Sequence, residues 1–166
     1  MATIAINPTT LVKTWVIVLN KEEMFSRVSI RSVYINNKLS PEQRAESREM
    51  LEDDRIMFGK YFGGSVADLI MLLTRNFSEE FSDTNIDADG NITLTIFPTT
   101  LMPDSIVFPL EERILQYIES YCLSKWLQTE SGPLGMDAEF SEAQSKLLGA
   151  IHYRRKGIRR PIDPLF

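Results

Sequence analysis

The chain has 166 residues, of which 43% are apolar and 25% charged, with a net charge of −5; this is the size and composition of one globular domain. No apolar run approaches the roughly 18 residues that a membrane span requires, and the first residues lack the basic and long apolar regions of a secretory signal. A single cysteine excludes an internal disulfide, and one cysteine with one histidine excludes the usual zinc ligand sets, so we expect a chain of a reducing compartment.

The first element is expected within residues 8–25, where Thr9 or Thr10 could cap a helix that follows Pro8. Apolar residues then recur at helical spacing. However, the run from Trp15 to Leu19 is nearly continuous and β-branched, which also fits a buried strand. We favour the helix and keep the strand open. Apolar and polar residues alternate over 27–35, which predicts a short strand closed by a turn at Asn36 and Asn37.

The best local signal is the capping box Ser40-Pro41-Glu42-Gln43, in which Ser40 caps a helix and Pro41 occupies its first position. We expect this helix to reach Tyr61 and to end at Gly63 and Gly64. A second capping box at 65–68 then predicts a new helix. That helix would be strongly buried through Leu69, Ile70, Leu72 and Leu73, and would fade at Arg75 and Asn76.

A hairpin is expected at about residues 91–108, inserted between two helical halves. Residues 78–90 are polar and acidic and predict a loop. Alternation over 92–96 predicts a half-buried strand, a turn follows from Pro98 to Pro103, and residues 105–108 are expected to pair back as the second strand. The run 85–90 has the spacing that opens a calcium loop, but its twelfth position is Ile96 instead of a glutamate, so a turn that enters the hairpin is the better interpretation.

Two helices are expected at 110–129 and 137–155, separated by a Gly- and Pro-containing break at 131–135. Their apolar residues recur at steps of three and four and form one broad face on each helix. The fold class that follows is mainly α: a helical bundle with an inserted two-stranded β-hairpin, with residues 1–153 as a single domain.

Residues 154–166 form a basic, proline-containing tail. This segment holds five of the 18 basic residues and one of the 23 acidic residues, a net charge of +4, and the remaining 13 basic and 22 acidic residues leave the body at −9. Pro161 and Pro164 favour an extended tail. Apolar and basic side chains interleave in it, which suits a groove or a sheet edge on a partner. The candidate partner-binding residues are Arg154, Arg155, Lys156, Ile158, Arg159, Arg160, Ile162, Leu165 and Phe166. A merely solvated tail and nucleic-acid binding by the same arginines remain alternatives.

No constellation of residues predicts catalysis. His152 lies near an expected helix end, where a packing or helix-dipole role is more common than a base. Cys122 falls on an apolar helix face. Glu52, Asp53 and Asp54 are consecutive, so they fan out around a helix, and we expect them to form a solvated face. Gly63-Gly64-Ser65 lacks the lysine of a nucleotide-binding loop. We therefore expect a protein that is not an enzyme and has no cofactor and no metal.

The order of these elements resembles the head–tail connector (adaptor, head-completion) proteins of tailed bacteriophages over roughly residues 40–166. The resemblance is carried by Phe108-Pro109-Leu110-Glu111-Glu112-Arg113-Ile114, by Tyr117, Tyr121 and Trp126-Leu127, by 140–148 and by the terminal arginines from Arg154 to Pro161. It implies a helical virion protein, present in the host cytoplasm during assembly, that forms a ring of commonly twelve copies and has no enzymatic activity. Its partners would be further copies of itself, the portal protein and a tail or next-ring protein, with DNA passing through the lumen and no membrane contact. The tail 154–166 would dock on the portal or on an adjacent copy, and the hairpin 91–108 would face the next ring.

Overall fold

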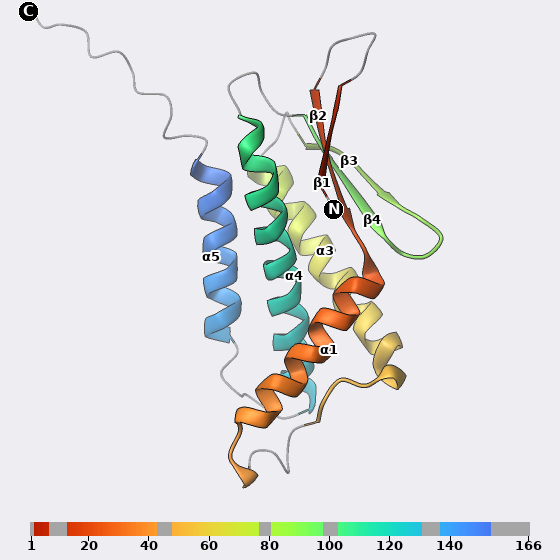
Figure 1. Ribbon diagram of the computed structural model, residues 1–166, viewed down its shortest axis with the longest axis vertical. Coiled ribbons are helices and arrows are strands. Elements are labelled where there is room, and N and C mark those ends of the chain that lie inside the picture. The colour runs from red at the N-terminus through yellow and green to blue at the C-terminus, as the bar shows by residue number, and fades with distance from the viewer. Residues whose placement is uncertain are drawn as a thin grey trace, which may run out of the picture.

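The computed structural model describes residues 2–6, 13–42, 48–76, 81–97, 103–130 and 137–153. Within them, four long α-helices accompany one antiparallel sheet (Figure 1). The helices are α1 (Lys21–Lys38), α3 (Arg55–Asn76), α4 (Val107–Glu130) and α5 (Asp137–Tyr153), and the strands are β1 (Ala2–Ile6), β2 (Lys13–Leu19), β3 (Phe81–Ile86) and β4 (Ile92–Ile96). Short 3₁₀ turns precede α3 (Glu52–Asp54) and α4 (Asp104–Ile106). The prediction of a mainly α fold with an inserted hairpin is confirmed.

Two hairpins that lie far apart in the chain form the four-stranded sheet. β1 pairs with β2, β3 pairs with β4, and β2 pairs with β4, so the strand order is β1-β2-β4-β3. Alternate residues point to opposite faces. On the inner face of the two central strands, Trp15, Ile17, Leu19, Leu94 and Ile96 are completely buried. One side of the sheet therefore closes the core.

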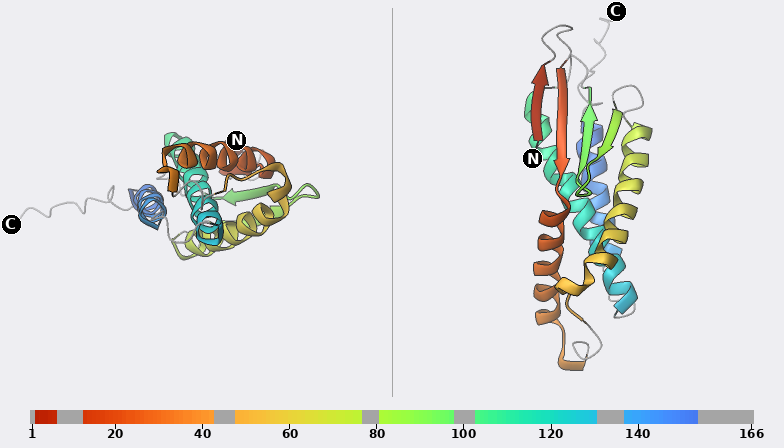
Figure 2. Two further views of the ribbon diagram at one scale, coloured as in Figure 1. Left: turned by 90° about the horizontal axis from the view of Figure 1, so that it is seen from below. Right: turned by 90° about the vertical axis from the view of Figure 1, so that its right-hand side faces the viewer.

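Helix α4 is the centre of the helical part. It packs against α1, α3 and α5 and also touches β1 and β2. Seen along the long axis of the molecule, α4 lies between α1 and α3, with α5 on its outer side (Figure 2). The predicted apolar face of this helix is confirmed, because Leu110, Ile114, Tyr117, Ile118 and Trp126 are all buried. The predicted helix at 137–155 is also confirmed as α5.

The N-terminal third of the chain differs from the prediction. Residues 13–19 form strand β2, so the helix favoured over 8–25 is wrong and the alternative is borne out for this run. The strand predicted at 27–35 is wrong as well, because α1 runs through it. Its buried face includes Ser32 and Asn36, two polar residues that conceal the helical period in the sequence. The cap of α1 is Asn20, whose side chain accepts the backbone N–H of Glu23 at 2.9 Å.

The two capping boxes do not define two helices. Pro41 and Glu42 are helical, but residues 48–51 are not, and α3 begins only at Arg55. The helix then continues without interruption through Gly63 and Gly64, so the predicted break there is wrong. Ser65 caps nothing: it is buried in the middle of α3, and its hydroxyl donates to the carbonyl oxygen of Phe62 at 2.7 Å.

The inserted hairpin is real but lies earlier in the chain than predicted. Its first strand is β3 at 81–86, within the run interpreted as a loop, and its second strand is β4, the predicted strand 92–96. Residues 105–108 are not a strand, because a 3₁₀ turn leads there directly into α4. A turn does lie within 85–90, but it follows the end of β3 and connects β3 to β4 instead of entering the hairpin. Gly90 in it has a φ of 80°, a conformation that glycine adopts without strain.

One segment, Glu52–Arg75, is long and apolar enough to cross a membrane by length and composition alone. The sequence was expected to contain no such run. The core helix of a water-exposed protein meets the same criterion, and Phe58, Phe62, Leu69 and Leu73 of this segment are buried in the bundle.

Candidate interaction surfaces

The candidate partner-binding residues of the tail, from Arg154 to Phe166, lie outside the described residues. The helix that leads to them, α5, makes its main contacts with α4. The ring of Phe140 packs 5.4 Å from that of Tyr117 and 5.5 Å from that of Tyr121, measured between centroids, and Leu147 and Ile151 are buried behind it. The tail thus follows a helix that packs on α4 through aromatic and aliphatic side chains.

A polar groove of about 330 Å³ lies where α4, α5 and α1 meet. Arg31 of α1 reaches across it to Glu119 of α4, at 2.8 Å, and to Glu139 of α5. Further along the groove, Lys146 pairs with Glu142 at 2.6 Å and holds the pKa of that carboxyl below its usual range. The lining has three basic and four acidic side chains, a net charge of −1, so most of its charges are already balanced by opposite ones and little excess charge is left for a ligand.

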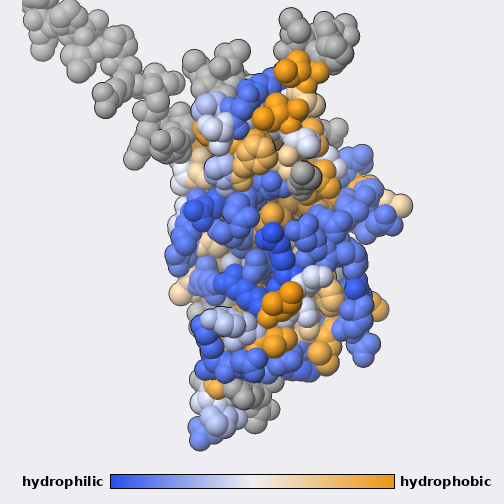
Figure 3. All heavy atoms as spheres, in the orientation of Figure 1, coloured by the Kyte–Doolittle hydropathy of each residue, from blue (hydrophilic) through white to orange (hydrophobic). Residues whose placement is uncertain are grey.

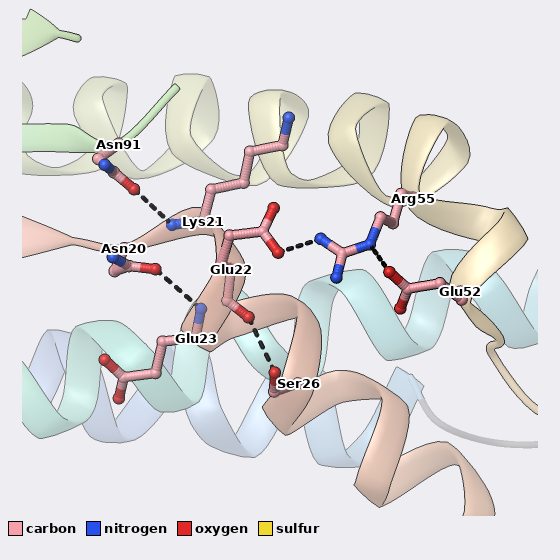
Figure 4. A network of polar contacts seen from close by, with 8 residues as sticks. All are labelled: Asn20, Lys21, Glu22, Glu23, Ser26, Glu52, Arg55 and Asn91. Atoms are coloured by element: carbon pink, nitrogen blue, oxygen red, sulfur yellow. Dashed lines mark hydrogen bonds and ion pairs between the residues drawn. The ribbon is translucent and has the colours of Figure 1, made fainter. Parts of the chain in front are cut away.

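The carboxylates Glu52, Asp53 and Asp54 begin the segment that leads into α3. Glu52 and Glu22 both bind the guanidinium group of Arg55, which thereby joins the start of α1 to the start of α3 (Figure 4). The same guanidinium group lies 4.6 Å from the centroid of the Phe25 ring. Asp54 pairs with Arg48 and accepts the backbone N–H of Leu51 at 2.8 Å. The contacts of Glu52 and Asp54 are those of a structural junction. The solvated face expected for these carboxylates is therefore wrong at Asp54, which is buried.

The same junction includes the turn of the β3–β4 hairpin. The backbone N–H of Lys21 donates to the side-chain oxygen of Asn91 at 3.1 Å (Figure 4). Within the turn, Asp87 accepts the backbone N–H groups of Asn91 at 2.8 Å and Asp89 at 3.0 Å, and the side-chain amide of Asn91 at 2.9 Å. These bonds lower the pKa of Asp87, the side chain of Asn91 contributing most. The resemblance of 85–90 to a calcium loop is therefore explained by a carboxylate that organises its own turn.

The segment before the 3₁₀ turn Glu52–Asp54 is hydrogen-bonded to two helices, α1 and α4. Its buried residue, Met50, donates its N–H to the Ser32 hydroxyl at 2.9 Å and accepts the Ser29 hydroxyl on its carbonyl oxygen at 2.8 Å. The indole N–H of Trp126 on α4 donates to the carbonyl oxygen of Arg48 at 3.0 Å. This segment therefore closes the end of the bundle opposite the sheet.

The remaining sequence candidates for chemistry are structural where they are described. Cys122 is fully buried on α4, and burial raises the pKa of its thiol to about 12, which disfavours the nucleophilic thiolate at neutral pH. The side chain of His152 lies outside the described residues. No group of three or more histidine, cysteine or acidic side chains that could hold a metal ion occurs within the described ranges.

Three surfaces that the sequence did not single out present apolar side chains outward. On α1, Ile30 and Tyr34 are 71% and 59% exposed, and on α3, Ile56 and Met71 are 81% and 71% exposed. The outer face of the sheet presents Val16, Val18, Thr93 and Thr95. Apolar side chains are visible over β1 and β2 and, in a smaller area, over α1 (Figure 3). For the surface on α3, the signal in the sequence was the recurrence of Ile56 and Met71 on one helical face. The break expected at Gly63 and Gly64 concealed it, because it divided this run into two helices.

Comparison with models of protein families, with curated protein sequences and with solved structures gives no match.

Proposed function

We propose that this chain is a structural connector subunit that joins the portal-bearing head of a tailed phage to its tail and assembles as a ring. The observation that carries the proposal is the placement of a basic, apolar and proline-containing segment, with a net charge of +4, behind a body with a net charge of −9. Opposite charges on two parts of one chain favour contact between the tail of one copy and an acidic surface elsewhere.

The helix pair that precedes this segment supports the proposal. Apart from the arginines of the tail, the residues that carry the resemblance to connector proteins fall on α4 and α5. These two helices pack together through Tyr117, Tyr121 and Phe140. In the proposed ring, the tail binds the portal or a neighbouring copy, and the acidic body lets DNA slide through the lumen without adhering. The hairpin that would face the next ring is β3–β4.

The test compares the full chain with a variant that lacks 154–166, by negative-stain electron microscopy and native mass spectrometry at high concentration, alone and with a portal protein. We expect rings or portal complexes from the full chain only, and a truncated protein with an unchanged circular-dichroism spectrum. Unchanged assembly after truncation would contradict the proposed role of the tail.

Two matched variants of full length separate the two chemistries of the tail. One replaces the five basic residues by glutamine, and the other replaces Ile158, Ile162, Leu165 and Phe166 by serine. If the tail docks on a protein partner, it requires both the basic and the apolar residues, so each of the two variants should fail to assemble. If only the basic residues matter, and DNA affinity falls steeply as salt rises, the second candidate function, a nucleic-acid-binding accessory protein, is favoured instead.

A further inference from the structure

The outward side of α3 carries a long surface with a single charge. Six exposed residues, spaced at steps of three and four, follow one side of the helix over five turns. They are Ile56, Lys60, Gly63, Ala67, Met71 and Thr74, which we call the α3 stripe. The exposed faces of α1 and α5, in contrast, carry several charges each, among them Glu22, Glu23 and Lys38 on α1 and Glu142 and Lys146 on α5.

Side chains of the α3 stripe project far from the helix near its two ends and are small in its middle. Ile56 and Met71 project near the two ends, at 81% and 71% exposure. Gly63 and Ala67 lie between them, and a Cβ added at Gly63 would meet no other atom within 4 Å. A second helix can therefore approach the backbone of α3 closely at this point, with its side chains set between those of α3.

We propose that the α3 stripe binds the α3 stripe of a second copy of this chain, with the two helices antiparallel. A twofold axis through the turn between Gly63 and Ala67 places Gly63 of one copy opposite Ala67 of the other. The same operation places Ile56 opposite Thr74 at each end. A surface that pairs with itself about a twofold axis must be self-complementary. The stripe meets this condition in side-chain size, because the small Gly63 faces the small Ala67 and the large Ile56 faces the smaller Thr74.

Charge selects the antiparallel direction. Asp68 is exposed beside the stripe. In the antiparallel pair, Lys60 of one copy lies about 3 Å along the axis from Asp68 of the other, from the rise of 1.5 Å per residue. The Lys60 stem then covers Met71 of the second copy, and its ammonium group reaches the carboxylate. A parallel pair would instead place Lys60 against Lys60 and Asp68 against Asp68, and like charges repel.

The interface is small, so the dimer is expected to be weak and reversible. A helix of 22 residues is about 33 Å long, and one helix pair lies at the lower end of specific interfaces. The inference does not rest on the connector proposal. Seen from below, α3 forms one edge of the molecule and α5, which leads to the tail, lies at another side, so the two surfaces are separate (Figure 2).

Cysteine cross-linking tests the pairing directly. Gly63→Cys and Ala67→Cys are prepared separately, with tags of different mass, mixed at high concentration and oxidised mildly. We expect the mixed 63–67 disulfide to exceed both the 63–63 and the 67–67 products. Ser145→Cys, on the exposed face of α5, is the matched control and should give only background, and Cys122 is buried and should not react. Dominant 63–63 product, Tyr34→Cys cross-linked to Gly63→Cys, or background levels throughout would each overturn the proposal.

A charge exchange provides an independent measurement. Lys60→Glu should weaken the dimer about tenfold in sedimentation equilibrium, and Lys60→Glu with Asp68→Lys should restore it. Because Asp68 also contacts Tyr121, the thermal unfolding of each variant is recorded as a check of folding. Unchanged association of Lys60→Glu would contradict the proposed pairing. A second result would also contradict it: the protein binds phosphatidylcholine vesicles, and Ile56→Asp abolishes this binding without changing the oligomeric state.

Discussion

Gly64 on α3 lies against Tyr121 on α4, so that a methyl group added at Gly64 would lie 3.3 Å from the hydroxyl oxygen of Tyr121. The two consecutive glycines do not end the helix, because α3 runs without interruption through both of them. The glycine at 64 admits the aromatic ring of the neighbouring helix, and α3 gains a contact with α4 in place of a terminus. Gly63, one residue earlier, faces open space.

The two glycines therefore predict opposite mutational outcomes at adjacent positions. Gly63→Ala should raise the free energy of unfolding by about 0.5–1 kcal/mol, because alanine restricts the unfolded chain and favours the helix. Gly64→Ala has the same intrinsic benefit but displaces Tyr121, so its net effect should be smaller or destabilising. Urea unfolding at low protein concentration measures both. Adding Tyr121→Phe to Gly64→Ala should recover part of the difference, and equal stability of the two alanine variants would contradict the proposed contact.

The segment before α3 predicts a second contrast between neighbours. Met50 is completely buried and its backbone is held by Ser29 and Ser32, whereas Leu51 is 53% exposed. Met50→Ala should cost about 2–5 kcal/mol, because it leaves a cavity in the core, and Leu51→Ala should change stability by no more than about 0.5 kcal/mol. Chemical unfolding gives both values. Similar losses for the two variants would show that Met50 does not close the end of the bundle.

Acid should destabilise the protein partly through Asp87 and Asp104. The pKa of Asp87 is lowered by Asn91, and that of Asp104 is lowered chiefly by Lys13 and further by the indole N–H of Trp15. A depressed carboxyl pKa in the folded state gives stability that is fully present above the unfolded value, about 3.9, and that is lost as pH falls through the folded value. Asp87→Asn and Asp104→Asn should each flatten the loss of stability below about pH 4. Unfolding midpoints between pH 6 and pH 2 measure this, and an unaltered acid slope in both variants would refute it.

The buried thiol predicts a simple chemical result. Because burial raises the pKa of Cys122 to about 12, the native protein should not react with a thiol reagent such as DTNB at pH 8. The same protein in guanidinium chloride should react completely. Ser145→Cys should add one thiol that reacts at once in the native state. Rapid reaction of the unmutated native protein would mean that α4 opens readily.

The helices α4 and α5 could be predicted from the sequence because each presents an uninterrupted apolar face at one period. Strand β4 could be predicted because its apolar residues alternate with polar ones, which is the period of two of a strand with one buried face. The errors occurred where local signals conflict with tertiary contacts. In α1, Ser32 faces the interior because it accepts the N–H of Met50, so the apolar period is broken at a buried position. Strand β3 is polar, and its place is fixed by backbone pairing with β4, which composition does not reveal.

The two candidate surfaces, the tail and the α3 stripe, also differ in whether the sequence could predict them. The tail 154–166 could be found from composition alone, since charge and proline content are local properties. The α3 stripe could not, because it depends on the helix continuing past Gly64, whose packing partner Tyr121 lies more than fifty positions later in the chain. Exposure of Ile56 and Met71 is likewise a property of the assembled bundle.

The pairing of β2 with β4 has a consequence during synthesis. Leu19 is matched to Ile92, so the first hairpin leaves the ribosome long before its permanent neighbour exists. Two strands alone are marginally stable in water, and Trp15, Ile17 and Leu19 would meanwhile face solvent. Nascent chains arrested before β4 should therefore be captured by chaperones or precipitate, whereas arrest after α4 has emerged should release material that resists protease.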